Sequence, residues 1–337
     1  MKPNKNNLAV LLCILRGESR TADIVKSLIG KDVRSIQRSL ARLTELGLVN
    51  KQGPSNNPAY TINYASLVVA NIPEKIFYDD DRPETHYNFA LLDWLEQTDN
   101  QLFERLLSGN SEYHSPATTP KLSMKELEYL TVELSWKSSA LEGNTYTLLD
   151  TQLLLTEGVR PKNRTEFETQ MILNHKEAIA FIVENGNLFS DMLSFSTIEE
   201  LHHIIGKNLG IESGVRKKII RISASNYVPL TAPQQLRESI DRSLAIISHT
   251  TNPYVRSLLA FGLIPYIQAF EDGNKRTGRM LANALLIHSI GRGFSLRGTN
   301  ARSLALAYLA FYEFNSLIPL GNILQSELDP HLPHVIN

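Results

Sequence analysis

The stretch QAFEDGNKRTGR at residues 268–279 brings together side chains that could hold a phosphate. A Gly-Asn turn at 273–274, directly ahead of a predicted helix, would point backbone N–H groups and the positive end of the helix dipole at one spot. Arg276 and Arg279 are three residues apart, so both can face the same anion. Asp272 is a candidate ligand for Mg²⁺ that bridges phosphate oxygens. The alternative is a helix start with ordinary surface cations; the spacing is not that of a Walker A loop.

The first residue of this stretch limits the chemistry that it can perform. Gln268 carries an amide, which cannot accept a proton near neutral pH and therefore cannot serve as a general base. Three hypotheses stay open: an active transferase, an altered transferase, or a nucleotide-binding loop that has lost its reaction.

A second stretch, SSALEGN at residues 138–144, offers a group that could block the first. Glu142 lies at the end of a predicted helix, and its carboxylate could enter the anion site, pair with Arg279 and repel a phosphate. The alternative is a C-cap turn at Gly143 with an exposed glutamate.

Helical periodicity predicts the elements that must position both stretches. A capping box, Ser123 to Glu126, opens a helix toward Leu141, and a second box is predicted at Ser196 to Glu199. The segment KKIIRISASNYVPL alternates like a strand around residues 218–222. Further helices are predicted at 88–107, 165–184, 196–209, 233–247, 252–267, 277–289 and 301–314. The fold class is therefore mainly α. His202 and His203 lack further ligands at metal-site spacing, so we expect them to be structural or solvated.

The first 64 residues differ in charge from the rest of the chain. They contain ten Lys/Arg and four Asp/Glu, which gives 10 − 4 = +6; the whole chain carries −1, so the remainder carries −7. Three short helices are predicted at 7–16, 21–28 and 32–46, followed by two strand-like pieces in LVNKQGPSNNPAYTI. This order resembles a winged helix-turn-helix.

The third of these helices, capped by Asp32 and ended by Gly47, has an apolar face and a basic face. They lie nearly opposite each other, with Val33, Ile36, Leu40 and Leu43 on the first and Arg34, Arg38 and Arg42 on the second. Such a helix can pack on its own domain and turn cations toward DNA, so we expect DNA binding. A solvated helix face and a protein-docking module are the alternatives.

The stretch at 268–279 resembles the signature of the Fic family, His-x-Phe-x-(Asp/Glu)-Gly-Asn-Gly-Arg-x-x-Arg. The matching positions are Phe270, Asp272, Gly273, Asn274, Arg276 and Arg279. The resemblance covers roughly residues 85–320 and implies an all-α core, with GVRKKIIRISASNYVPL as a β-hairpin flap beside the target segment. It also implies a protein adenylyltransferase that uses ATP and Mg²⁺ to modify a protein hydroxyl. SSALEGN matches the family's inhibitory motif at Ser138, Glu142, Gly143 and Asn144.

Two positions depart from the family signature. Gln268 replaces the catalytic His, so AMP transfer should fall by a factor on the order of 10²–10⁴. Lys275 replaces the second Gly and resembles the Gly-Asn-Lys-Arg form of Doc toxins, which transfer phosphate. Glu142 could also serve as a base for hydrolytic removal of AMP. The alternative function is a transcriptional regulator that binds DNA and whose degenerate Fic domain senses nucleotide.

Composition and length set the remaining expectations. The 337 residues contain no apolar run long enough to span a membrane, and Cys13 is the sole cysteine, so we expect a cytoplasmic protein without an intrachain disulfide. We also expect a homo-oligomer. The predicted organisation is a winged helix at 1–66, a linker with a helical extension at 67–122, a Fic domain at 123–320 and a tail at 321–337. The inhibitory helix would occupy about 123–144 of that Fic domain.

Overall fold

The computed structural model of the chain describes residues 3–28, 30–79, 82–98, 122–190 and 192–328. Most of these residues are helical, which confirms the mainly α fold class. The chain divides into two compact units, and each is described by itself. The first unit comprises residues 1–107, 220–230 and 304–320, and the second comprises residues 108–219, 231–303 and 321–337.

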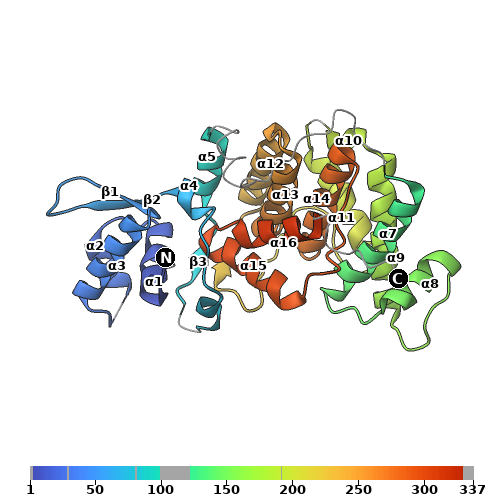
Figure 1. The fold of residues 1–337 in the computed structure, drawn as a ribbon, viewed down its shortest axis with the longest axis horizontal. Coiled ribbons are helices and arrows are strands. Elements are labelled where there is room, and N and C mark those ends of the chain that lie inside the picture. Colours follow the sequence, from blue (N-terminus) through green and yellow to red (C-terminus); the bar gives the residue numbers. More distant parts are fainter. Residues whose placement is uncertain (1–2, 29, 80–81, 99–121, 191, 329–337) are drawn as a thin grey trace. The chain divides into compact units, whose positions relative to one another are not determined.

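The first unit begins with three helices and a hairpin. In Figure 1 these are α1 (Lys5–Leu15), α2 (Thr21–Ser27), α3 (Val33–Glu45), β1 (Val49–Gln52) and β2 (Ala59–Ile62). The two strands pair antiparallel, with Val49 opposite Ile62 and Gln52 opposite Ala59. This element order is the one that the sequence predicts; the assignment as a winged helix stays a prediction.

Helix α3 begins where its sequence predicts. The Asp32 side chain caps the helix by accepting a hydrogen bond of 3.1 Å from the backbone N–H of Ser35. Ile36, Leu40 and Leu43 are buried in the core of the first unit, as expected. Val33, however, is 45% exposed, so its prediction as a core residue is wrong. The buried face is centred on positions 36, 39, 40 and 43, and the first helical residue lies at the edge of that face.

The rest of the first unit contains short elements and one long helix. They are α4 (Tyr64–Leu67), the 3₁₀ helix η1 (Glu74–Tyr78), β3 (Thr85–His86), α5 (Phe89–Gln97), β4 (Tyr227–Val228) and most of α15 (Ala301–Phe314). Of the helix predicted at 88–107, the structure shows α5, which ends at Gln97. Residues 99–107 of the predicted range lie outside the described residues.

The predicted strand around 218–222 is misplaced. Those residues form no strand; strand β4 lies at Tyr227–Val228 and pairs in parallel with β3. The Glu313 carboxylate explains this position, because it accepts a hydrogen bond of 3.0 Å from the backbone N–H of Asn226. The same carboxylate forms an ion pair of 2.9 Å with buried Arg82. Tertiary contacts therefore decide where this segment becomes extended.

Helices make up the second unit almost entirely. They are α7 (Met124–Ala140), α8 (Leu148–Glu157), α9 (Glu166–Glu184), α10 (Asn187–Ser190), α11 (Phe195–Gly206), α12 (Pro233–His249), α13 (Pro253–Ile267), α14 (Asn274–Ile290) and most of α16 (Ile318–Leu328). The sequence did not lead us to expect α8, α10 or α16. The boundary proposed at residue 320 falls inside α16.

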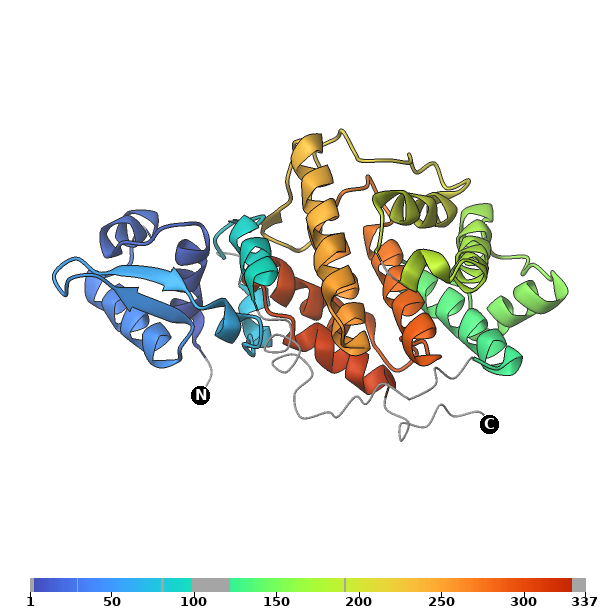
Figure 2. The same cartoon turned by 90° about the horizontal axis from the view of Figure 1, so that it is seen from above.

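Helices α13 and α14 lie side by side at the centre of this unit (Figures 1 and 2). Their close approach depends on Gly278, where an added Cβ would lie 2.9 Å from Cδ of Pro265. Helix α14 begins at Asn274, three residues before the predicted start at Thr277, because Gly273 adopts a left-handed conformation with φ 79° and starts the helix there.

The two predicted capping boxes have different outcomes. Ser123 and Glu126 form the predicted reciprocal hydrogen bonds at the start of α7. The box predicted at Ser196 to Glu199 is wrong, because α11 starts earlier, at Phe195, and Ser194 caps it by accepting from the N–H of Thr197. No helix among the described residues is both long and apolar enough to cross a membrane.

Candidate functional site

The stretch predicted to hold a phosphate forms a tight connection between α13 and α14, and we call residues 268–276 the anion loop. Its first residue, Gln268, is the C-cap of α13 and adopts a left-handed conformation with φ 54° and ψ 48°. Gly273 is left-handed as well and precedes the first turn of α14. The chain therefore reverses within six residues and presents the N-terminus of α14 at the loop.

Asn274 closes the loop from the inside. Its side-chain oxygen accepts from the N–H of Phe270 at 3.0 Å, and its amide donates to the Phe270 carbonyl at 2.9 Å. The same amide also donates to the side-chain oxygen of Gln268 at 3.2 Å. These bonds engage the Asn274 side chain within the loop, so its side chain shapes the site.

Gln268 faces the helix that precedes it. Its side-chain N–H donates to the Pro265 carbonyl at 2.6 Å, and the residue is 7% exposed. That carbonyl is one of the helix-end acceptors that need a partner. The amide thus braces the end of α13.

Two residues outside the loop hold its backbone. Buried Arg216 donates from Nε to the Gln268 carbonyl at 2.6 Å, and its backbone N–H donates to Ala269 at 2.8 Å. His202 donates from Nε2 to the Asp272 carbonyl at 2.9 Å and stacks on Phe270, with ring centroids 3.8 Å apart. Burial lowers the pKa of His202, which keeps the ring neutral.

His202 was expected to be structural or solvated, and Arg216 was not singled out from the sequence at all. The position of His202 on the same face of α11 as Ile198, Leu201 and Ile205, all buried, was the available signal. Nothing in the sequence indicates that this face packs on the anion loop.

The two arginines of α14 are buried and only partly paired. Arg276 and Arg279 are 2% and 0% exposed. Arg276 donates to the Asp272 carboxylate at 3.1 Å, and Arg279 donates to the Glu142 carboxylate at 2.6 Å. Each retains an Nη1 without a hydrogen-bond partner among the described residues. Buried N–H donors on charged groups are costly to leave unpaired, so this region suits an anion.

Glu142 is fixed in place by the chain that follows it. Helix α7 ends at Ala140, and Gly143 turns the chain with φ 91°. The Asn144 amide donates to the Glu168 carbonyl at 2.8 Å. The Glu168 carboxylate accepts from the hydroxyl of Thr145 at 2.6 Å, and this bond, with those from Thr165, lowers the pKa of Glu168 to about 2.

Ser138 connects Arg279 to a buried histidine. The Ser138 hydroxyl oxygen accepts from Nε of Arg279 at 3.0 Å, and its carbonyl accepts from Nη2 at 3.2 Å. His175 lies 2.7 Å from the Met171 carbonyl through Nδ1, so Nδ1 carries the proton and Nε2 accepts from the Ser138 hydroxyl at 2.8 Å. Complete burial lowers the pKa of His175 to about 3. The sequence did not indicate this residue.

Asp272 is the one predicted metal ligand. Its side chain is 67% exposed, and its carboxylate accepts from the Gly273 N–H at 2.5 Å and from Arg276. No group of three or more His, Cys, Asp or Glu side chains that could hold a metal occurs among the described residues. A single exposed carboxylate fits Mg²⁺, which is commonly held by one or two carboxylates and the phosphates of its nucleotide.

The predicted DNA contacts lie in the first unit, on α3. Arg34 and Arg38 are exposed, as such a role requires. Arg42 is half-buried and pairs with Glu45 at 2.6 Å, so it is less available. The structure therefore separates two exposed cations from one that is already paired.

Comparison with known proteins shows where the family resemblance lies. Residues 192–286 match the model of the Fic/DOC family. The protein adenylyltransferase Fic of Nematostella vectensis is 26% identical over 203 residues, which cover 58% of this chain and 46% of that protein. Protein adenylyltransferase fic-1 of Caenorhabditis elegans is 26% identical over 180 residues, covering 51% of this chain and 34% of that protein.

The chain thus spans less than half the length of these relatives. A solved structure of Fic-1 from C. elegans covers 94% of this chain and 78% of its own, with a TM-score of 0.52 and 17% identity, which shows a similar fold. The chain therefore contains a Fic/DOC family domain, which spans residues 192–286.

Proposed function

We propose that the anion loop binds the phosphates of ATP. The Nη1 groups of buried Arg276 and Arg279, which have no hydrogen-bond partner in the described part of the chain, are the observation that carries this proposal. Together with the N-terminus of α14 they supply charge-assisted donors for a phosphate. Phe270, within the loop, is buried, and Lys275 is partly exposed and would add a further cation for the nucleotide.

Mg²⁺ would be held at Asp272. Bound there, the ion would neutralise phosphate charge and orient the nucleotide. An ion held by Asp272 would compete with Arg276 for the carboxylate, and a further Arg276 N–H would then be available to phosphate.

Glu142 would inhibit the protein from within. Its carboxylate forms an ion pair with Arg279, which is 0% exposed, and would repel a phosphate at the same place. Ser138 and Asn144 hold this arrangement, because the first fixes Arg279 and the second fixes the turn after Glu142.

Transfer of AMP to a protein hydroxyl would be weak or absent. Gln268 has no basicity near pH 7, and its amide is engaged by the Pro265 carbonyl and by Asn274. Loss of a general base reduces a rate by a factor on the order of 10²–10⁴. The protein is thus a nucleotide-binding, self-inhibited Fic-type protein whose transferase reaction is impaired.

Calorimetry with ATP and Mg²⁺ tests the nucleotide site. Removing the carboxylate with Glu142→Gln should tighten binding relative to wild type, because Arg279 becomes available to phosphate. Glu157→Gln, an exposed change at the end of α8, is the matched control and should bind like wild type. If neither wild type nor Glu142→Gln binds, the proposed nucleotide site is wrong.

Labelled ATP tests the reaction itself. Gln268→His combined with Glu142→Gly should give self-modification from α-labelled ATP that wild type lacks. Label transferred from the γ-phosphate instead would indicate phosphate transfer, the hypothesis that Lys275 supports. Release of AMP from a previously modified target by wild type, lost in Glu142→Gln, would indicate AMP removal with Glu142 as the base. Ready self-modification by wild type would contradict the impaired reaction.

A second candidate function is DNA binding by the N-terminal part of the first unit, which would make the protein a nucleotide-sensing regulator. Two observations favour it: the net charge of +6 over residues 1–64 and the exposed Arg34 and Arg38 on α3. Affinity for duplex DNA should fall steeply with salt, and it should weaken in Arg34→Ala/Arg38→Ala. Salt-insensitive or absent binding would refute this function.

A further inference from the structure

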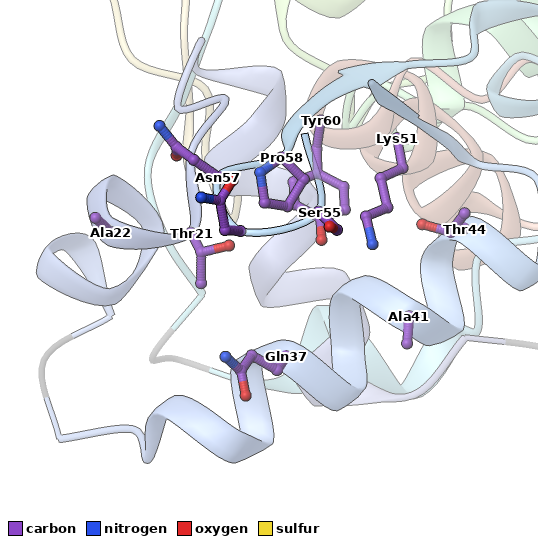
Figure 3. Close-up of a pocket in the computed structure, with 11 residues that line it drawn as sticks. Thr21, Ala22, Gln37, Ala41, Thr44, Lys51, Ser55, Asn57, Pro58 and Tyr60 are labelled. Carbon is purple, nitrogen blue, oxygen red and sulfur yellow. The ribbon is translucent and has the colours of Figure 1, made fainter. Parts of the chain in front are cut away.

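A groove of about 670 Å³ lies between α3 and the β1–β2 hairpin (Figure 3). Three segments line it: the start of α2, one flank of α3 and the hairpin with its loop. Gln37 and Thr44 come from α3, and Lys51 extends from β1 toward that helix (Figure 3). Arg34, Arg38 and Arg42 do not line it.

The walls of this groove are held by hydrogen bonds and by the core. The backbone N–H of Tyr60 donates to the Ser19 carbonyl at 2.8 Å, and Arg20 donates to the Asn57 carbonyl at 2.5 Å. These bonds tie the hairpin to the chain just before α2. Ile36, Leu40 and Leu43 anchor α3 in the core. The groove is therefore preformed, which lowers the conformational cost of binding a ligand.

Two polar side chains of the groove are available to bind a ligand. The side chains of Gln37 and Lys51 are exposed and form no hydrogen bond or ion pair with any described residue. The other polar lining side chains are amides and hydroxyls, among them Asn56, Asn57 and Thr44, and no lining residue is acidic. Amide, hydroxyl and ammonium groups without a carboxylate suit a ligand that carries negative charge and hydrogen-bonding edges.

The surroundings favour a duplex of DNA as that ligand. An apolar groove would suit a peptide helix, but this lining is mostly polar. Arg34 and Arg38 add exposed cations on the same helix. Helix α3 has 13 residues. At that length it is about 20 Å long, and it can enter the major groove of B-DNA, which is about 12 Å wide, but not the narrow major groove of A-form RNA.

We propose that one strand of a DNA duplex passes through this groove, with Lys51 on a backbone phosphate and Gln37 on the edge of a base. A glutamine amide can form two hydrogen bonds with adenine in the major groove, so Gln37 would supply sequence preference. Lys51 would supply affinity that does not depend on sequence. This inference rests on the proposed DNA binding. It adds the path of the DNA strand and the residue that contacts a base.

Selection from a pool of random-sequence DNA duplexes with the full-length protein tests the proposal. Wild type should enrich a motif that contains an adenine. Gln37→Ala should lose this preference, so that discrimination between adenine and the other bases at that position falls roughly 5- to 150-fold. Lys51→Ala should bind all duplexes more weakly and lower the slope of log affinity against log salt by about 1. Lys26→Ala, an exposed cation on α2 outside the groove, is the charge-matched control for Lys51→Ala and should keep the motif.

The outcomes separate the groove from DNA binding in general. If wild type selects a motif and both Gln37→Ala and Lys51→Ala keep the same motif and salt slope, the groove assignment is wrong while DNA binding stands. If wild type shows no salt-dependent binding to any duplex, or prefers a pool of RNA, both are overturned. Equal thermal unfolding of all variants, expected for exposed side chains, excludes misfolding as the cause.

Discussion

At the scale of single residues, the site depends on side chains that hold other side chains. Arg279 is fully buried, yet Ser138 and Glu142 compensate its charge with three hydrogen bonds. Ser138 in turn donates to His175, whose tautomer is fixed by the Met171 carbonyl. A buried guanidinium needs such support, because an unpaired buried charge is strongly destabilising.

Ser138→Ala should lower the free energy of unfolding by about 1–3 kcal/mol, because it leaves buried donors and acceptors on Arg279 and His175 without a partner. Ser135→Ala is a matched control on the same helix, since the Ser135 hydroxyl is equally buried but has no partner among the described residues. That change should be neutral or stabilising. Urea unfolding measures both, and equal losses would contradict the role of Ser138.

His175 should make stability depend on pH. Its pKa is lowered from 6.5 to about 3 by burial, so the unfolded chain takes up a proton below pH 6.5 while the folded chain does not. Stability is therefore fully present above pH 6.5 and is lost as the pH falls toward 3, by about 1.4 kcal/mol per pH unit within that window. His202, whose pKa is also lowered, adds in the same direction.

Urea unfolding at pH 7, 6 and 5 measures this effect, with His175→Gln as the comparison. The variant should show a shallower pH dependence than wild type because one of the two histidines is gone. An unchanged slope would mean that the pKa of His175 is not lowered in the folded protein.

At the scale of elements, the anion loop depends on how closely α13 and α14 approach. Pro265 lies inside α13, and its ring sits against Gly278 of α14. The same turn of α13 supplies the Pro265 carbonyl to Gln268. Packing between the helices and the shape of the loop are therefore linked through Pro265.

Gly278→Ala should destabilise the protein by about 1–3 kcal/mol, although alanine favours helices over glycine. The added Cβ would lie 2.9 Å from Cδ of Pro265 and 3.3 Å from the Ala260 carbonyl, so the helices must move apart. Ser289→Ala, at the partly exposed end of α14, should change stability by less than about 0.5 kcal/mol. Chemical denaturation measures both; a stabilised Gly278→Ala would show that the interface relaxes at little cost.

At the scale of the whole molecule, the chain forms two compact units, each with its own core and its own tryptophan. Trp94 lies in the first unit on α5, and Trp136 lies in the second on α7. The first unit also includes residues 220–230 and 304–320, tied to residues 82–86 by Arg82, Glu313 and the β3–β4 pair. Its integrity therefore depends on parts of the chain more than 200 positions apart.

Glu313→Gln should destabilise the first unit by about 3–5 kcal/mol, because it leaves the Arg82 charge buried without its counter-ion. The fluorescence of Trp94, measured in a Trp136→Phe background, should show a larger shift of the unfolding transition than that of Trp136 in a Trp94→Phe background. Asp241→Asn, which breaks an exposed pair with Arg237, should cost no more than about 1 kcal/mol. Equal shifts at both tryptophans would mean that the two units unfold as one.

The sequence by itself determined the features that depend on local spacing. The helical periodicity predicted the mainly α fold, the Asp32 cap and the Ser123–Glu126 box are short-range signals, and the order of residues 268–279 predicted the loop before α14. The pairing of Glu142 with Arg279 was also foreseen, because SSALEGN and the stretch at 268–279 resemble two motifs of the same family.

Only the tertiary structure decided which side chains meet across long distances in the chain. The contacts of His202 and Arg216 with the loop, and of His175 with Ser138, join residues 37 to 70 positions apart, and no local pattern encodes them. The strand at Tyr227–Val228 forms where Glu313 and β3 offer hydrogen bonds. The amide of Gln268 could be read from the sequence, but its partner could not. The fold shows that this amide donates to the Pro265 carbonyl from a left-handed residue at the end of α13.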